Sequence, residues 1–276
     1  MTTDPSTMNP LDPTAAALLL RGDTQHVTTL TLNRPQARNA LSKELIAALQ
    51  AELDAIALDT SVHVVVLAGA GPAFCAGHDL KDIRAAGYAP DYAEALFEAC
   101  AQLMQRIVSL PQPVIARVHG IATAAGAQLV ASCDLAIAAD TARFATPGVN
   151  IGLFCSTPMV ALSRNVSHKH AMQMLLTGEL IDAATALRFG LINEAVPETE
   201  LDAAVTALAE KIASKSRHTL AIGKAAFYQQ AELPLAQAYD YAKGVMVANL
   251  QAHDAQEGIG AFIDKRAPVW CHGATP

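Results

Sequence analysis

The sequence predicts an α/β fold in which short strands alternate with helices and a helical region follows. Two segments carry this prediction, because in each an apolar strand ends in small residues that open a helix; they contain the strands Val62–Leu67 and Pro113–Val118. After Pro158, apolar residues recur mostly at helical spacing, with one short strand expected at 192–196. The strand at 62–67 is too continuously apolar to face water on one side, so we expect it to be buried on both faces.

The other elements follow from local residue choice. Gln25–Leu32 is rich in Thr and Val, which favour a strand. Ser42 is a good N-cap for a helix over Glu44–Leu58, where apolar residues recur at helical spacing. A later segment, Leu233–Leu250, is amphipathic and fits either an intersubunit helix or one packed on its own subunit. Further expected elements are helices at 91–108 and around 126–131, and strands at 134–138 and 143–145.

Composition excludes several classes of protein. The 276-residue chain is 52% hydrophobic and 16% charged, as in a globular enzyme, and its net charge of -7 gives no support for binding nucleic acid. No apolar run approaches the roughly 18 residues of a membrane span. The cysteines have no paired spacing, which favours a reducing compartment without disulfides. Residues 1–13 are polar and lack Lys and Arg, so we expect a disordered tail and a cytoplasmic protein.

The two strand–helix corners hold the chemistry that the sequence offers. They are Phe74–Lys81 and His119–Gln128, and small residues in both leave backbone N–H groups uncovered. Two converging N–H groups form an oxyanion hole, which stabilises negative charge developing on a carbonyl oxygen. A helix N-terminus adds its dipole in the same direction.

These motifs resemble the crotonase superfamily, the enoyl-CoA hydratase/isomerase family, over nearly the whole chain. The matching segments are Leu32–Ser42, Phe74–Lys81, Val118–Asp134, Thr177–Ile192 and Glu257–Arg266. The resemblance implies a crotonase (ClpP-like) spiral of repeated ββα units at 14–212 and a C-terminal helical region at 213–276. It also implies self-association to a trimer or hexamer and an acyl-CoA thioester as substrate, with coenzyme A as part of the substrate and no separate cofactor.

By the same resemblance, the backbone N–H groups of His78 and Ala125 should be the oxyanion donors. Ala at position 125 requires a negative φ there. The two positions at which ordinary hydratases carry catalytic glutamates hold Gln128 and Gly148. The residues that the resemblance assigns to substrate binding are Ala37, Arg38, Ala76, His78, Asp79, Leu80, Lys81, Ala125, Phe262 and Lys265.

Several of these positions admit a structural role instead. The His78 side chain could serve as an acid or base beside the thioester, or hydrogen-bond locally. Asp79 fits a loop-shaping acceptor of backbone N–H groups. Lys81 could contact the CoA nucleotide or simply be solvated at a helix start. Phe262 and Lys265 could contact adenine and phosphate, or belong to an ordinary amphipathic helix.

The missing glutamates leave two functions open. Hydration needs a base and an acid, and neither Gln128 nor Gly148 can exchange a proton. The side chains that could replace the missing acid or base are Asn150, Cys155, Ser156 and His78. The sequence contains no metal motif that could do so. One hypothesis is a lyase-type or related enzyme of fatty acid metabolism that stabilises an enolate in hydration, isomerisation or decarboxylation. The other is a non-catalytic acyl-CoA-binding or scaffold protein.

Overall fold

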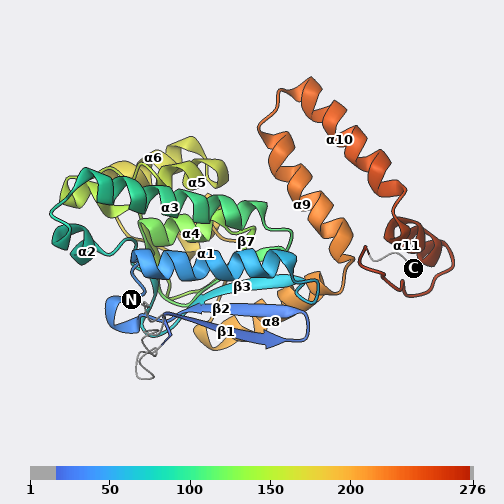
Figure 1. Cartoon of the computed structure of the whole chain (residues 1–276), viewed down its shortest axis with the longest axis horizontal. Coiled ribbons are helices and arrows are strands. Elements are labelled where there is room, and N and C mark those ends of the chain that lie inside the picture. Colours follow the sequence, from blue (N-terminus) through green and yellow to red (C-terminus); the bar gives the residue numbers. More distant parts are fainter. Residues whose placement is uncertain (1–16, 274–276) are drawn as a thin grey trace, which may run out of the picture.

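The computed structural model describes residues 17–273 (Figure 1), and its strands form two β-sheets. The larger sheet has six strands in the order β1-β2-β3-β5-β7-β10. Its strands are β1 (Leu19–Thr24), β2 (Val27–Leu32), β3 (Val64–Gly69), β5 (Val114–Val118), β7 (Leu135–Ala139) and β10 (Glu194–Val196). The smaller sheet has the order β4-β6-β8-β9, with β4 (Ala73–Cys75), β6 (Ile121–Thr123), β8 (Arg143–Ala145) and β9 (Ile181–Asp182).

The helices follow the strands along the chain. They are α1 (Lys43–Leu58), α2 (Leu80–Ala85), α3 (Pro90–Ser109), α4 (Ala125–Ser132), α5 (Pro158–Asn165), α6 (His168–Thr177), α7 (Ala183–Phe189), α8 (Leu201–Ala213), α9 (Arg217–Ala231), α10 (Leu235–Leu250) and α11 (His253–Ile263). Short 3-10 turns lie at Pro35–Ala37, Pro147–Ile151 and Glu198–Glu200.

The chain winds as a spiral of ββα units, as the family resemblance implies. The pairs β3/β4, β5/β6 and β7/β8 each give one strand to each sheet, and every pair is followed by one or two helices. Within each sheet these strands pair in parallel. Parallel strands need a crossover, and the helices supply it while covering the sheets.

The core lies between the sheets and helices α1, α3 and α4. Every residue of β3 is buried, as its continuous apolar run predicts. Phe74 and Phe144, one in each of two neighbouring units, are among the largest fully buried side chains. A second apolar cluster lies where α8 covers the opposite face of the large sheet. The spiral is therefore held by burial inside one chain.

Strand β1 is the main element that the sequence does not predict. It pairs antiparallel with β2 along its whole length, but all its residues after Leu19 are exposed, so it lacks the alternation by which a strand is recognised. The expected tail at 1–13 lies outside the described residues. The chain leaves α8 at Ala213 and enters α9 at Arg217, and the division into domains stays a prediction. None of the described helices is long and apolar enough to cross a membrane.

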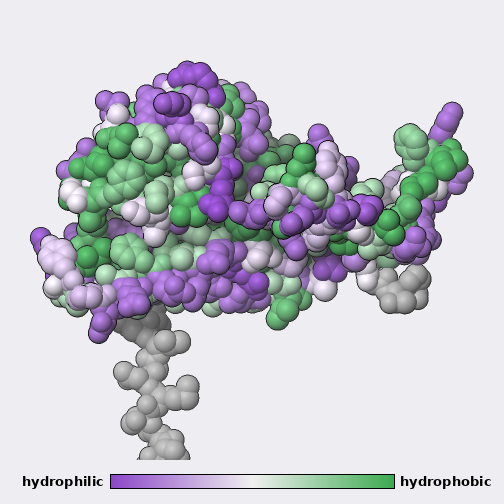
Figure 2. Space-filling view, turned by 90° about the horizontal axis from the view of Figure 1, so that it is seen from above, coloured by the Kyte–Doolittle hydropathy of each residue, from purple (hydrophilic) through white to green (hydrophobic). Residues whose placement is uncertain are grey.

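Helices α9, α10 and α11 extend away from the sheets (Figure 1). Helix α9 has no buried residue and α10 has one, Ala238. Apolar side chains are nevertheless frequent on this part of the molecule, which Figure 2 shows as green areas on the projecting end. The C-terminal helices thus leave apolar surface uncovered within one chain.

Candidate active site

The two strand–helix corners predicted from the sequence meet in the structure. Gly77 has a φ of +93°, and a Cβ added there would lie 2.9 Å from the Cβ of Ala124 and 3.3 Å from the backbone N of Ala125. A side chain at position 77 would therefore separate the corners. Glycine supplies both the left-handed backbone and the close approach.

Helix α4 begins at Ala125, directly after a strained residue. Ala124 has φ 50° and ψ -119°, a region that alanine rarely adopts, and its N–H donates to the carbonyl of Ala145 at 2.9 Å. Ala125 itself is not among the residues with positive φ, as its Cβ requires. The backbone strain, which a glycine would relieve, is therefore at Ala124 and not at the proposed donor, Ala125.

The backbone N–H groups of His78 and Ala125 have no acceptor among residues 17–273. His78 is flanked by two backbone bonds, because Leu41 N–H donates to Gly77 and Asp79 N–H donates to Leu41. Ala125 is the first residue of a helix, so its N–H has no intrahelical partner. Both residues line one cavity, so two unused donors are available there.

That cavity has a volume of about 580 Å³ and is mostly apolar. It is lined by Ala76, His78, Leu80, Ile83, Phe97, Ala124, Ala125, Pro147, Gly148, Asn150, Ile151, Leu153, Phe154, Cys155, Ser156, Thr157 and Pro158. None of these is an aspartate or glutamate. A site of this kind holds an apolar group and offers few proton-exchanging side chains.

His78 is the one titratable nitrogen base lining the cavity. Burial lowers the pKa of His78 to about 4, so the imidazole is neutral at pH 7. Its ring meets that of Phe97 edge-on, with centroids 5.2 Å apart, and its Nε2 atom is buried without a partner among the described residues. Of the two alternatives for His78, a local side-chain hydrogen bond thus has no partner at Nε2 among the described residues.

The two positions of the missing glutamates differ in surroundings. Gly148 lines the cavity, but a Cβ there would lie 2.9 Å from the Leu153 carbonyl oxygen and 3.0 Å from the Cys155 sulfur. Gln128 is buried in α4, and its Oε1 has no partner in the described part of the chain. A glutamate at 148 is excluded sterically unless the loop at 153–155 moves.

Cys155 is a packed thiol. Burial raises its pKa, and it accepts the Gly148 N–H at 3.4 Å. A thiol in that state is a poor nucleophile. Asn150 is also engaged, because its side-chain amide donates to the carbonyl of Gly178 at 3.3 Å.

The loop containing Ala37 and Arg38 is joined to the first corner by backbone hydrogen bonds. Ala76 N–H donates to the Arg38 carbonyl at 3.0 Å, which places the two predicted contact segments side by side. The residue that sequence reasoning missed is Asn39, whose buried side-chain amide donates to the carbonyls of Ala73 and Phe74 at 2.7 and 3.1 Å. Asn39 has a positive φ of 54°, which Asn tolerates, but its carbonyl partners lie 34 and 35 residues away and leave no local signal in the sequence.

Asp79 shapes the first corner, as expected. It caps α2 by accepting the Lys81 N–H at 3.0 Å and pairs with Arg34 at 3.0 Å, a partner that the sequence did not predict. The side chain of Lys81 is exposed. It is free to reach a ligand or to remain solvated.

Phe262 and Lys265 are not brought to the cavity. Phe262 lies in the last turn of α11 and Lys265 follows the helix, far from α2 and α4 (Figure 1), and neither residue lines the cavity. Phe262 is 85% exposed. Within one chain these residues form no part of the site.

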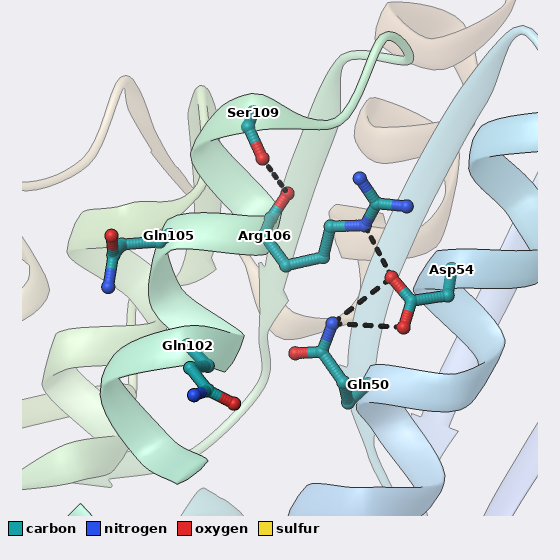
Figure 3. Close-up of a pocket in the computed structure, with 6 residues that line it drawn as sticks. All are labelled: Gln50, Asp54, Gln102, Gln105, Arg106 and Ser109. Carbon is teal, nitrogen blue, oxygen red and sulfur yellow. Dashed lines mark hydrogen bonds and ion pairs between the residues drawn. The ribbon is translucent and has the colours of Figure 1, made fainter. Parts of the chain in front are cut away.

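A second depression, between α1 and α3, has a different character (Figure 3). Its polar lining is largely paired: Arg106 contacts Asp54 at 2.7 Å, and the Gln50 amide donates to the same carboxylate. The ion pair closes the floor of the depression. We assign no ligand to it.

Comparison with known proteins identifies the family. The family model described as enoyl-CoA hydratase/isomerase matches residues 22–273. The chain belongs to this family. The rat enoyl-CoA hydratase domain-containing protein 3, mitochondrial, is 49% identical over 89% of this chain and 82% of its own. The Escherichia coli 2,3-dehydroadipyl-CoA hydratase is 36% identical over 88% of this chain and 94% of its own.

Solved structures agree. An enoyl-CoA hydratase from Mycobacterium smegmatis is 53% identical, with a TM-score of 0.90 over 92% of this chain and 99% of its own. Human enoyl-CoA hydratase domain-containing protein 3 is 45% identical, with a TM-score of 0.89 over 92% and 100%. The crotonase fold is thereby confirmed, and the similarities place the chain in the enoyl-CoA hydratase domain-containing protein 3 branch of the family.

The expected cytoplasmic location is contradicted. The vertebrate relatives at 43–49% identity are all named as mitochondrial proteins. The expectation rested on polar, non-basic residues 1–13 and on unpaired cysteines. Unpaired cysteines indicate a reducing environment without identifying the compartment, so they could not support that address.

Proposed function

We propose that the protein binds an acyl-CoA thioester, with the thioester carbonyl between the N–H groups of His78 and Ala125. The observation that carries this proposal is the pair of unused donors at touching corners, both lining one apolar cavity. The acyl group would occupy the cavity, and the donors would stabilise the enolate oxygen. One such donor lowers a barrier by about 3–4 kcal/mol in comparable sites. A place in fatty acid metabolism would follow from such a substrate.

Calorimetry with a saturated acyl-CoA tests the binding step. We expect a dissociation constant in the micromolar range, which corresponds to a binding free energy of about -8 kcal/mol. Lys81→Glu should weaken binding, and more strongly at low salt, because a lysine beside the first corner would face the CoA phosphates. Lys211→Glu, on α8 across the large sheet, is the matched control and should bind as the wild type does. Folded wild-type protein that binds no acyl-CoA would remove the assignment.

Ordinary two-glutamate hydration is not the reaction that we propose. The cavity lining contains no carboxylate, and each positioned acid or base contributes about 10²–10⁴-fold to rate. We therefore expect crotonyl-CoA to be hydrated several orders of magnitude more slowly than by an ordinary hydratase. Turnover of crotonyl-CoA at about 10²–10³ per second would contradict this.

Decarboxylation of a 2-carboxyacyl-CoA is the catalytic candidate that the same lining favours. Loss of CO₂ leaves the bonding electron pair on the α-carbon as an enolate, so no protein base is needed, and a later proton from water completes the product. Mass spectrometry of malonyl-CoA and methylmalonyl-CoA incubations tests it, with CO₂ release as the product signal. Tight binding without conversion of either thioester would favour a non-catalytic acyl-CoA-binding or scaffold protein.

The proposed site also includes a second copy of the chain. Phe262 and Lys265 are remote from the cavity of their own chain, and α9 to α11 expose apolar side chains. We propose a trimer or hexamer in which α11 of one copy reaches the CoA portion bound by another. In this arrangement Phe262 and Lys265 would contact bound CoA, and a neighbouring chain would cover the exposed apolar side chains of α9 to α11.

A further inference from the structure

The C-terminal segment 264–273 returns to the start of α11, where one buried carboxylate holds it. Asp254 is 2% exposed and accepts the backbone N–H groups of Cys271 at 2.8 Å and His272 at 3.1 Å. It also accepts the hydroxyl of Ser216, the N-cap of α9. The position of Cys271 is therefore set by hydrogen bonds to its backbone.

Three side chains with different ligand chemistry meet at this point. Nδ1 of His253 lies 3.9 Å from Oδ1 of Asp254. His253, Asp254 and Cys271 each offer one ligand atom, and these atoms all lie within 4.8 Å of one another. Imidazole, carboxylate and thiolate are the three ligand types that Zn²⁺ takes in proteins.

The separations are slightly wider than in a loaded zinc site. Bond lengths of about 2.0–2.3 Å place neighbouring ligands of a tetrahedral zinc roughly 3.2–3.8 Å apart. His253 is exposed. Because its imidazole is free to rotate into another rotamer, it can close a gap of about 1 Å without moving the backbone.

Charge also favours a cation here. The Asp254 carboxylate is held in place because it accepts the Ser216 hydroxyl and the backbone N–H groups of Cys271 and His272. A Zn²⁺ ion would replace the thiol proton of Cys271 and neutralise the resulting thiolate beside that carboxylate.

Cys271 differs from the other cysteines in its access to solvent. Cys75, Cys100, Cys133 and Cys155 are buried, whereas Cys271 is partly exposed. Burial raises the pKa of Cys75 and Cys100 to about 12. Thiols in that state stay protonated and are poor ligands, so Cys271 is the described cysteine best suited to bind a metal.

We propose that His253, Asp254 and Cys271 form a binding site for Zn²⁺ or another borderline-soft divalent cation, with a fourth position open to water. The ion cross-links the start of α11 to the end of the described chain. The ligands come from two adjacent residues and one distant residue, which is not a recognised metal motif; their proximity arises only when the chain end folds back.

Zinc titration of untagged full-length protein tests the site, with Co²⁺ as a spectroscopic probe. We expect one saturable site per chain and a thiolate-to-cobalt charge-transfer band in the near ultraviolet. Cys271→Ser should abolish the band and weaken zinc binding at least about 100-fold, and His253→Gln about 10-fold or more. His168→Gln, which removes an exposed histidine on α6, is the control and should bind as the wild type does.

Both test variants retain Asp254, and thermal unfolding establishes that each is folded. Wild-type protein without saturable zinc uptake overturns the proposal. So does a Cys271→Ser or His253→Gln variant that binds zinc as tightly as the wild type. Alkylation of Cys271, followed by mass spectrometry, gives an independent measurement. Saturating zinc should slow the alkylation because the thiolate is then bound to the metal, and an unchanged rate contradicts the site.

Discussion

The spiral core buries its apolar side chains within one chain, whereas the C-terminal helices leave many of theirs exposed. In the core, β3 is buried on both faces, and Phe74 and Phe144 are fully enclosed. On α10, by contrast, Tyr239 is 71% and Met246 66% exposed. The core is therefore complete within one chain. The helices carry an apolar face that only another surface can cover, and such a face marks an interaction site.

The spiral core and the C-terminal helices are joined to each other by polar contacts. The attachment of α9 to the core is polar: Lys224 pairs with Asp134 at 2.7 Å, and Tyr228 donates to the same carboxylate at 2.9 Å. Trp270 adds a hydrogen bond from Nε1 to the Ser214 carbonyl at 3.0 Å. Contacts of this kind fix a direction but bury little apolar area. The C-terminal helices are thus held in place while their apolar face stays available.

The largest effect should follow from placing charge on that face. If the proposed assembly of three or six 28.9 kDa chains forms, Tyr239→Glu combined with Met246→Glu should convert it into monomers, since each carboxylate would be desolvated at the interface. Light scattering after size exclusion measures the mass. Lys211→Glu, an exposed charge reversal on α8 of the core, is the control. Wild-type protein that is already monomeric at micromolar concentration would remove the contrast between the two regions.

Two glycine-to-alanine substitutions, one in the core and one in the C-terminal helices, compare the two regions by their free energies of unfolding. A Cβ at Gly126 would lie 2.0 Å from the Cys75 carbonyl oxygen, so Gly126→Ala should cost more than about 4 kcal/mol of unfolding free energy. Gly244 on α10 has nothing within 4 Å, so Gly244→Ala should gain about 0.5–1 kcal/mol from helix propensity. Denaturant unfolding gives both values. A loss at Gly244 would show that another chain approaches closely there.

A smaller effect concerns pH. His78 has a folded pKa of about 4 against about 6.5 when unfolded, so between these values the unfolded chain binds the extra proton. Stability should therefore fall as pH drops from 6.5 to 4, by up to about 3 kcal/mol from this group. His63, whose pKa burial also lowers, acts in the same direction. His78→Phe should reduce the loss between pH 7.5 and 4.5; an unchanged loss would mean that His78 is not buried as a neutral base.

Sequence reasoning reached the elements whose signals are local. The buried run of β3, the Ser42 cap of α1 and the two corners all follow from residue type and spacing. It could not reach Asn39 or Phe97, because their roles depend on segments distant in sequence. It also placed Phe262 and Lys265 with the site by family likeness, although one folded chain keeps them apart.

The substituted glutamate positions show the same limit. That Gln128 and Gly148 cannot exchange a proton is evident from the sequence alone. That Gly148 is closed to any larger residue follows only from the approach of the Leu153 carbonyl and the Cys155 sulfur. Restoring a glutamate at 148 is therefore not a clean test of the chemistry, and the carbonyl site has to be examined directly.

The most direct test of the proposed oxyanion hole is isotope-edited infrared spectroscopy of a bound acyl-CoA labelled with ¹³C at the thioester carbonyl. Donors at His78 and Ala125 should pull electron density onto the oxygen, so the carbonyl stretch should move to lower frequency in the complex than in water. This reading needs no turnover and applies equally to an enzyme and to a binding protein. A bound thioester whose carbonyl frequency is the same as in water would contradict an oxyanion hole at these two residues.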